Sequence, residues 1–168
     1  MEPRKEDWTA PDDAAAENEM QELLYALVRM LKPRIVVETG AYLGHSTARL
    51  GLACAANGKG RVISCEPNAD YWKEAAARCV GLPVEVRRCK SEEVPELERA
   101  DFVFSDSDYK YRIAEISRCK KGAIVVVHDT RISYDPNVLP LEGLVSDLGG
   151  LTFNTYRGFG ILIRSGTH

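Results

Sequence analysis

Residues Val36 to Thr47 read VVETGAYLGHST, and this stretch decides the fold class. It begins with β-branched residues that suit a buried strand, turns at two glycines, and continues into a pattern typical of a helix. Glycine at position 40 allows a sharp bend and a close ligand approach, and Gly44 is expected to let the next helix pack against the strand. Ser46 and Thr47 can cap that helix, whose free N–H groups favour an anionic group. We therefore interpret the stretch as a strand, a ligand-binding turn and a helix, with Ser46 among the binding residues.

Strand and helix patterns alternate along the rest of the chain. A helix is expected from Pro11, carried by apolar residues at three- and four-residue steps and ended by Pro33. Strands are expected over 34–39, 61–66, 84–89, 101–106 and 123–129, with helical segments between them and another helix over 141–148. Two further strands, 151–157 and 158–164, are joined so closely that they can form only an antiparallel hairpin. This order predicts an α/β fold: a doubly wound, mostly parallel seven-stranded sheet with a C-terminal antiparallel hairpin.

Length and composition restrict the class of protein. The chain has 168 residues, of which 45% are hydrophobic and 28% charged, as in ordinary globular domains. We expect a polar, disordered N-terminus over 1–10 and a single domain over 11–168. No apolar run could span a bilayer and no hydrophobic signal segment is present, so we expect a cytoplasmic protein without a membrane partner. The net charge of −3 disfavours nucleic acid, and the five irregularly spaced cysteines favour neither disulfides nor a zinc site.

The glycine turn and a second acidic residue indicate a cofactor that contains a nucleoside. In doubly wound sheets, ligands bind at the carboxyl ends of the strands, where the strand order reverses. The second strand ends at Glu66, whose carboxylate can accept hydrogen bonds from both hydroxyls of a ribose. A dinucleotide fingerprint would place a glycine where this chain has Tyr42, so the turn suits a smaller group such as an amino-acid carboxylate. Nicotinamide and S-adenosylmethionine sites share the ribose-binding acid, and both remain open at this point.

Three motifs together resemble one family. VVETGAYLGHST, DSDYKY (106–111) and VVVHDT (125–130) resemble the class I S-adenosylmethionine-dependent methyltransferases, and within them the small-molecule O-methyltransferase-like group. The resemblance covers the chain from about residue 31 onward and implies the Rossmann-like methyltransferase fold. It implies the following cofactor-binding residues: Glu38, Gly40 and Gly44 at the methionine part, Tyr42 along the cofactor, Glu66 on the ribose, Lys90 and Ser91 at the adenine, and Asp106 beside the methyl donor.

The chain also departs from that family. Ser107 stands where the family usually has glycine, and Tyr109 stands where it usually has histidine. The chain is shorter than most members, so either the site is open or a second subunit completes it, as in a homodimer. The N-terminal segment and the loop RISYDPNVLP (131–140) are the candidate covers, and Tyr134 in that loop is our candidate substrate contact.

Four ionisable residues are predicted to meet at the ligand-binding edge: Asp106, Asp108, His128 and Asp129. In one mechanism, Asp106, Asp129 and His128 hold a divalent cation such as Mg²⁺, which lowers the pKa of a substrate hydroxyl. In the other, His128 or Asp108 acts directly as the general base. Each also has a structural alternative, because Asp108 can cap the following helix and His128 can be a buried histidine with satisfied hydrogen bonds.

The sequence therefore predicts an S-adenosylmethionine-dependent methyltransferase that acts on a small-molecule acceptor by O-methylation. The first alternative is an NAD(P)-dependent oxidoreductase of Rossmann fold, although the third fingerprint glycine and a Tyr-x-x-x-Lys pair are missing. The second alternative is a non-catalytic cofactor-binding module or partner subunit, which the short chain and the altered DSDY motif keep open.

Overall fold

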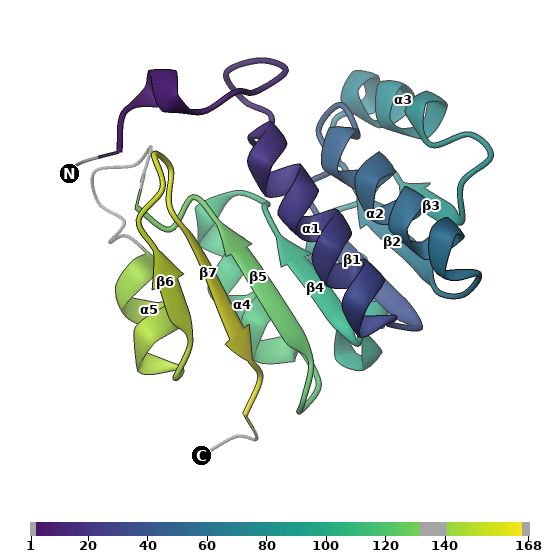
Figure 1. Cartoon of the computed structure of the whole chain (residues 1–168). Coiled ribbons are helices and arrows are strands. Elements are labelled where there is room, and N and C mark those ends of the chain that lie inside the picture. Colours follow the sequence, from purple (N-terminus) through teal and green to yellow (C-terminus); the bar gives the residue numbers. More distant parts are fainter. Residues whose placement is uncertain (1–2, 132–140, 166–168) are drawn as a thin grey trace.

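The computed structural model describes residues 3–131 and 141–165, and its centre is a seven-stranded sheet in the order β3-β2-β1-β4-β5-β7-β6 (Figure 1). Strands β1 to β5 are parallel, and β7 runs antiparallel to both β5 and β6. This confirms the predicted fold class. The strands are β1 Ile35–Thr39, β2 Arg61–Cys65, β3 Val84–Arg87, β4 Phe102–Ser105, β5 Ile124–His128, β6 Leu151–Phe153 and β7 Phe159–Ile163.

Helices cover both faces of the sheet because its strands are apolar on both sides. Val36 and Phe102 pack on the side of α1 and α2, whereas Val37 and Val103 pack on the side of α4 and α5. Figure 1 shows α3 beside α2. The helices are α1 Asn18–Leu31, α2 His45–Asn57, α3 Ala69–Arg78, α4 Tyr109–Arg118 and α5 Leu141–Asp147, and the short 3₁₀ turns are η1 Lys5–Asp7, η2 Ser91–Glu93 and η3 Pro95–Arg99. None of the described helices is long and apolar enough to cross a membrane.

Helix α1 begins at Asn18, so the prediction of a helix from Pro11 was wrong. The reason lies in Asp12, whose Oδ1 accepts hydrogen bonds from the backbone N–H groups of Ala14 and Ala15, each at 2.8 Å. An aspartate that bonds its own following backbone favours a turn over a helix. The predicted end is close to the observed one, because α1 finishes with left-handed Lys32 just before Pro33.

The N-terminal segment lies across the edge where the parallel strands end (Figure 1). The structure describes residues 3–10 of the stretch for which we expected disorder, and they include the turn η1. The carbonyl of Thr9 accepts a 2.7 Å hydrogen bond from the backbone N–H of Asn18, and Lys5 Nζ lies 2.7 Å from Asp13 Oδ1. The segment is therefore tied to the start of α1, beside the predicted site.

The two glycines of the turn are required by close contacts. The strand order reverses between β1 and β4, and there Gly40 has φ +85° and a Cβ would lie 2.6 Å from the carbonyl oxygen of Asp106. Gly44 has φ +81°, and a Cβ would lie 2.7 Å from Ala75 Cα of α3. Gly44 thus allows close packing against α3, which corrects our expectation of close packing against the strand.

We expect Gly40→Ala to destabilise the protein by about 3 kcal/mol, because it combines the strain of positive φ with a backbone clash. Gly122→Ala is the matched control: its φ is +82°, but a Cβ there meets nothing within 4 Å. The control should lose only the conformational part, about 1 kcal/mol. Urea denaturation of both variants measures the difference, and equal losses would show that the contact with Asp106 is not what requires glycine at position 40.

Candidate functional site

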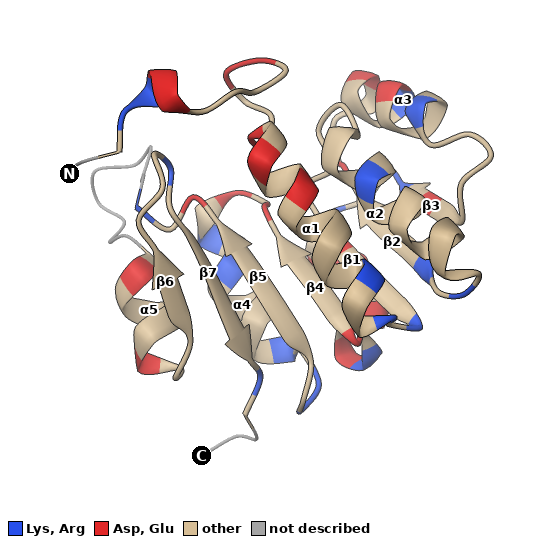
Figure 2. Ribbon diagram, in the orientation of Figure 1, with Lys and Arg blue, Asp and Glu red and all other residues tan. Residues whose placement is uncertain are grey.

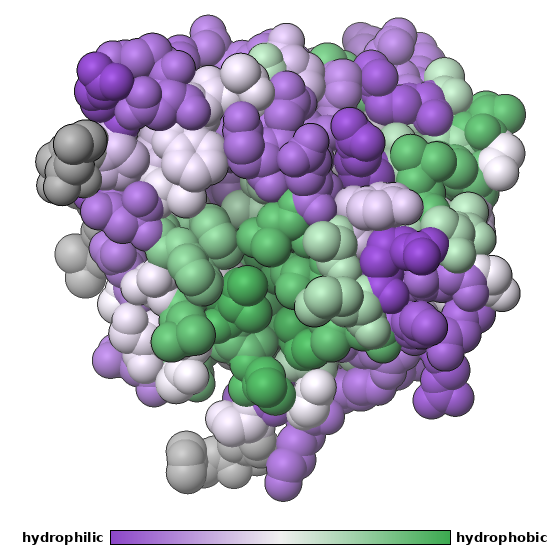
Figure 3. All heavy atoms as spheres, viewed as in Figure 1, coloured by the Kyte–Doolittle hydropathy of each residue, from purple (hydrophilic) through white to green (hydrophobic). Residues whose placement is uncertain are grey.

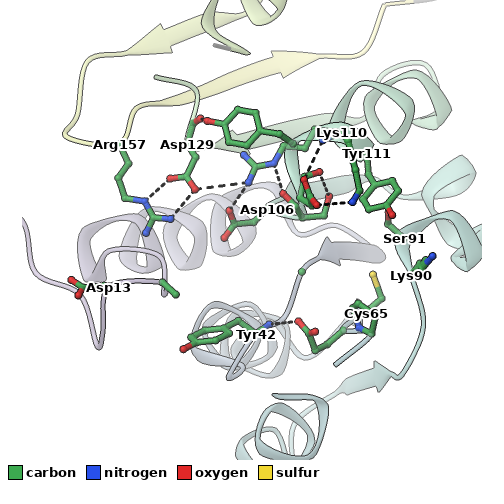
Figure 4. A pocket seen from close by; sticks show the side chains of 18 residues that line it. Asp13, Tyr42, Cys65, Lys90, Ser91, Asp106, Lys110, Tyr111, Asp129 and Arg157 are labelled. Atoms are coloured by element: carbon green, nitrogen blue, oxygen red, sulfur yellow. Dashed lines mark hydrogen bonds and ion pairs between the residues drawn. The ribbon is translucent and has the colours of Figure 1, made fainter. Parts of the chain in front are cut away.

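A cavity of about 980 Å³ opens at the carboxyl ends of the parallel strands. Its size is within the range of small-molecule sites. Figure 4 shows Tyr42 and Cys65 on one side of it and Asp106, Asp129 and Arg157 on the other. Six predicted cofactor-binding residues line the cavity: Gly40, Tyr42, Glu66, Lys90, Ser91 and Asp106. The other three, Glu38, Gly44 and Ser46, are not among the lining residues.

Glu66 is held in the cavity wall by backbone hydrogen bonds. Its Oε2 accepts from the N–H of Tyr42 at 2.9 Å, and its Oε1 accepts from the N–H of Asn68 at 2.8 Å. Tyr42 has φ 48°, a left-handed conformation within the turn that places this N–H. Each carboxylate oxygen keeps a second lone pair, so the fixed carboxylate can still accept from two neighbouring hydroxyls.

Glu38 is fully buried behind the cavity. Its Oε2 accepts hydrogen bonds from the hydroxyls of Thr47 and Ser64, and Oε1 has no hydrogen-bond partner among the described residues. Burial raises the pKa of Glu38 to about 7, although hydroxyls including that of Ser46 act in the opposite direction. Helix α2 has Gly44 as its N-cap and no side-chain cap, which corrects our expectation that Ser46 and Thr47 cap it. The Thr47 hydroxyl donates to Glu38 instead. Neither Glu38 nor Ser46 lines the cavity, and their contact with the cofactor stays a prediction.

The raised pKa of Glu38 predicts a pH-dependent stability. The folded state keeps the proton up to about pH 7, whereas the unfolded chain releases it near 4.5. The stabilisation is therefore fully present below pH 4.5 and is lost as the pH rises through 7, by about 3 kcal/mol. Urea denaturation from pH 4.5 to 8 should show wild type losing this stability relative to Glu38→Gln. Parallel pH profiles for the two proteins would contradict the buried, protonated carboxyl.

The two departures from the family motif have structural partners. Ser107 Oγ donates to Glu115 Oε1 at 2.6 Å, and the hydroxyls of Thr39 and Ser105 donate to Glu115 Oε2, both at 2.8 Å. The Tyr109 hydroxyl donates to the backbone carbonyl of Asp129. These bonds connect α4 to the ends of β1, β4 and β5, so they fix the positions of Ser107 and Tyr109, which both line the cavity.

An ionic cluster lies where β4 and β5 end. The predicted metal ligands Asp106, His128 and Asp129 do meet there, with ligand atoms within 4.8 Å of one another. Arg157 donates to both carboxylate oxygens of Asp129, at 2.5 and 2.7 Å (Figure 4). Arg112 Nη2 lies 3.3 Å from Asp106 Oδ1 and 3.9 Å from Asp129 Oδ2. Guanidinium groups therefore already pair with two of the three predicted ligands, Asp106 and Asp129.

His128 is enclosed between carboxylates, with only 1% of its surface exposed. Its Nδ1 lies 3.1 Å from Asp106 Oδ1, and its Nε2 lies 2.7 Å from Glu17 Oε2. Burial works against the charged ring, but the charges of Asp106 and Asp129 and both hydrogen bonds raise the pKa of His128 to about 10. At neutral pH the ring is thus an imidazolium with no free lone pair. It does not line the cavity, and this geometry does not support its predicted roles as general base or metal ligand.

The other predicted catalytic and substrate residues have mixed outcomes. Asp106 lines the cavity, and its pKa is lowered because the charges of His128 and Arg112 outweigh burial. Asp108 also lines the cavity, but it is the N-cap of α4 and lies 3.0 Å from Lys110 Nζ, which is the capping alternative given above. Tyr134, the predicted substrate contact, lies outside the described residues.

Three charged residues of the ionic cluster were not predicted from the sequence: Glu17, Arg112 and Arg157. Glu17 comes from the start of α1, Arg112 from α4, and Arg157 from the turn between β6 and β7. Arg157 also donates to the carbonyl of Ala15 at 2.8 Å, so it connects the N-terminal segment to Asp129. A signal for Arg157 existed, since antiparallel pairing of β5 with β7 places the residues after His128 beside those before Phe159.

The chain matches one family model and is similar in fold to several solved structures. A family model described as a methyltransferase domain matches residues 37–130, whereas no curated protein matches. The structure of the O-methyltransferase TomG from Streptomyces achromogenes, in complex with SAM, is similar with a TM-score of 0.73 and 20% identity over 92% of this chain and 83% of that one. An O-methyltransferase from Bacillus cereus, in complex with SAH, gives 0.71 and 18% over 92% and 84%. SAH-bound PaMTH1 from Podospora anserina gives 0.72 and 16% over 94% and 83%.

Proposed function

The chain belongs to the methyltransferase domain family, and we propose that it transfers a methyl group from S-adenosylmethionine to oxygen of a small molecule. The observation that carries this proposal is Glu66, a carboxylate fixed by two backbone N–H groups in the wall of a cavity at the ends of the parallel strands. Structures of similar fold have been solved with SAM or SAH. The family match favours this function over a nicotinamide-dependent oxidoreductase.

The lining residues suggest how the cofactor is bound. When bound, S-adenosylmethionine supplies a methyl group already activated by its sulfonium, so the protein's main task is alignment. Glu66 accepts hydrogen bonds from the ribose hydroxyls, and Lys90 and Ser91 contact the adenine. Gly40 leaves the backbone open for the methionine part, and Tyr42 lies along it. These assignments require only residues that face the cavity.

The residues present do not fit a divalent cation. Both oxygens of Asp129 are taken by Arg157, and both ring nitrogens of His128 face carboxylates. Three carboxylates, on Glu17, Asp106 and Asp129, are already balanced by the charges of His128, Arg112 and Arg157. An added divalent cation would lie among three positive groups. We therefore propose that methyl transfer does not use Mg²⁺.

The ionic cluster suggests different roles for the predicted catalytic residues. Asp106 and Asp129 both belong to the cluster and line the cavity, but both oxygens of Asp129 bind Arg157. Asp106, beside Gly40, is therefore our candidate for orienting the acceptor hydroxyl and taking its proton. His128 is a positioning residue that holds Asp106 through a 3.1 Å contact. Asp108, exposed and paired with Lys110, remains the second candidate base.

Calorimetric titration with S-adenosylhomocysteine tests the proposed function. Binding should be measurable in the presence of EDTA, it should be unchanged by added Mg²⁺, and NAD⁺ should give no heat. Binding of NAD⁺ instead would support the oxidoreductase alternative. Failure of both ligands to bind would leave the family assignment without a functional cofactor site.

We also propose a homodimer, formed through the outer strands of the sheet. Figure 3 shows apolar side chains gathered over β5 and β7 beside α1. At this edge, Leu151 is 68% exposed, Ile163 is 66% exposed and Phe153 is 39% exposed, and such contiguous apolar surface often marks an interface.

In analytical ultracentrifugation Leu151→Glu should sediment as a monomer, whereas the control Leu52→Glu on α2 should not change the dimer. A monomeric wild type would overturn this proposal.

The cytoplasmic location and the absence of a nucleic-acid partner stay predictions.

A further inference from the structure

A second cavity of about 770 Å³ lies under the N-terminal segment. It shares Asp13 and Arg157 with the first cavity, so the two adjoin at these residues. Its remaining lining residues come mainly from the N-terminal segment and the β6–β7 turn: Lys5, Glu6, Trp8, Thr9, Ala10, Asp12, Glu17 and Tyr156. A ligand in this space would lie next to the proposed cofactor, on the side of Arg157.

Glu17 presents a carboxylate oxygen that lacks a donor. The residue is 5% exposed, and its Oε2 is taken by His128, but Oε1 has no hydrogen-bond partner among the described residues. Arg157 Nε lies 4.0 Å from this oxygen, beyond hydrogen-bond distance, and donates to Asp129 instead. A buried carboxylate oxygen without a donor is unfavourable. A ligand that brings an N–H donor into the second cavity would satisfy it.

The lining of the second cavity is acidic. It contains four carboxylates, on Glu6, Asp12, Asp13 and Glu17, and two cations, Lys5 and Arg157. Most of these groups already have partners: Lys5 lies 2.7 Å from Asp13, Arg4 lies 3.5 Å from Glu6, His128 binds Glu17 through Oε2, and Arg157 pairs with Asp129. Figure 2 shows the resulting gathering of acidic residues over the N-terminal segment and the start of α1.

Aromatic side chains supply the apolar part of this cavity. Trp8 and Tyr156 both line it. Aromatic rings bind flat apolar groups and attract organic cations through their π-electrons. The cavity thus combines apolar surface, an acidic lining and one carboxylate oxygen without a donor among the described residues.

We propose that the second cavity binds the methyl acceptor and that the acceptor is a small aromatic molecule carrying a protonated amine. The amine donates to Glu17 Oε1, and the apolar body lies among Trp8 and Tyr156. This inference rests on the proposed function, because an acceptor must lie beside the cofactor cavity. It assigns acceptor binding to the N-terminal segment and to Glu17.

Three probes of one shape and different charge test the class of ligand: 2-phenylethylamine, 2-phenylethanol and 3-phenylpropionate. Each is titrated by calorimetry into the whole protein saturated with S-adenosylhomocysteine. The ammonium should bind about tenfold more tightly than the alcohol, because it adds one charge-assisted hydrogen bond, and the carboxylate should bind least. Equal binding of the amine and the alcohol, tighter binding of the carboxylate, or no binding of the amine at millimolar concentration would overturn the proposal.

Two variants locate the site. In Glu17→Gln the amide oxygen can still accept from His128, while its NH₂ replaces Oε1, so amine affinity should fall about tenfold or more. Trp8→Ala removes an aromatic wall in the N-terminal segment, outside the core, and should also weaken the amine. The control Glu22→Gln, exposed on the same helix, should change nothing. Unchanged amine affinity in both test variants would place binding elsewhere.

Binding of S-adenosylhomocysteine distinguishes a failure of the acceptor proposal from a failure of the proposed function. Trp8→Ala and Glu22→Gln should bind it with wild-type affinity, because neither residue lines the first cavity or belongs to the ionic cluster. If the wild type binds S-adenosylhomocysteine but not the amine, the acceptor inference fails and the proposed function stands. If S-adenosylhomocysteine itself does not bind, the proposed function fails.

Discussion

Replacing Glu66 with glutamine is expected to weaken binding of S-adenosylhomocysteine by about 100-fold. The wild-type carboxylate accepts one backbone N–H on each oxygen, from Tyr42 and from Asn68. A glutamine has only one acceptor end, so its NH₂ must face one of these N–H groups. The change removes the charge that strengthens hydrogen bonds from the ribose and also disturbs the turn.

Calorimetry on wild type, Glu66→Gln and Glu74→Gln measures this effect. Glu74 is exposed on α3 and does not line the cavity, so its substitution controls for the loss of one negative charge. Thermal unfolding shows whether each variant is folded. A folded Glu66→Gln protein with wild-type affinity would mean that Glu66 does not hold the ribose.

The second large effect is expected for Arg157→Met, which should destabilise the protein by about 3–5 kcal/mol. Arg157 is buried and donates to both oxygens of Asp129 and to the carbonyl of Ala15. Methionine keeps much of the apolar stem but leaves a buried carboxylate without its main partner. The variant also detaches the N-terminal segment from the site.

Urea denaturation gives the free energy of unfolding of this variant, and Arg61→Met is the control because Arg61 is exposed at the start of β2. Limited proteolysis should cleave Arg157→Met in the N-terminal segment before the rest of the chain. If Arg157→Met loses no more stability than the control, the ionic cluster does not depend on this guanidinium.

Much of the fold could be predicted because each local signal had a local cause. Buried parallel strands require continuous apolar runs such as Val36–Val37, and the chain reverses at glycines whose positive φ other residues rarely adopt. Where a local bond opposed the pattern the prediction was wrong, as with Asp12 and the start of α1. The cofactor side of the cavity was predictable for a similar reason, since Gly40 and Glu66 follow directly after their strands.

The ionic cluster could not be predicted in this way. Glu17 and His128 are 111 residues apart, and Arg157 and Asp129 are 28 residues apart. Such pairs form only when folding brings two distant parts of the chain together. A motif of neighbouring residues does not contain that information. From the sequence, the acids at the strand ends were compatible with a metal or with a general base, and nothing indicated that arginines would pair with them. The burial of Glu38 was hidden too, because its hydroxyl partners lie on α2 and β2.

A crystal structure of the protein with S-adenosylhomocysteine, grown in the presence of EDTA, would show where the cofactor binds and whether a metal is needed. We expect the ligand in the first cavity, with its ribose hydroxyls on the Glu66 carboxylate, its adenine near Ser91 and its amino-acid part over Gly40. The Arg157–Asp129 pair should be retained without a metal ion. An empty first cavity at saturating ligand, or a ribose bound away from Glu66, would contradict the account.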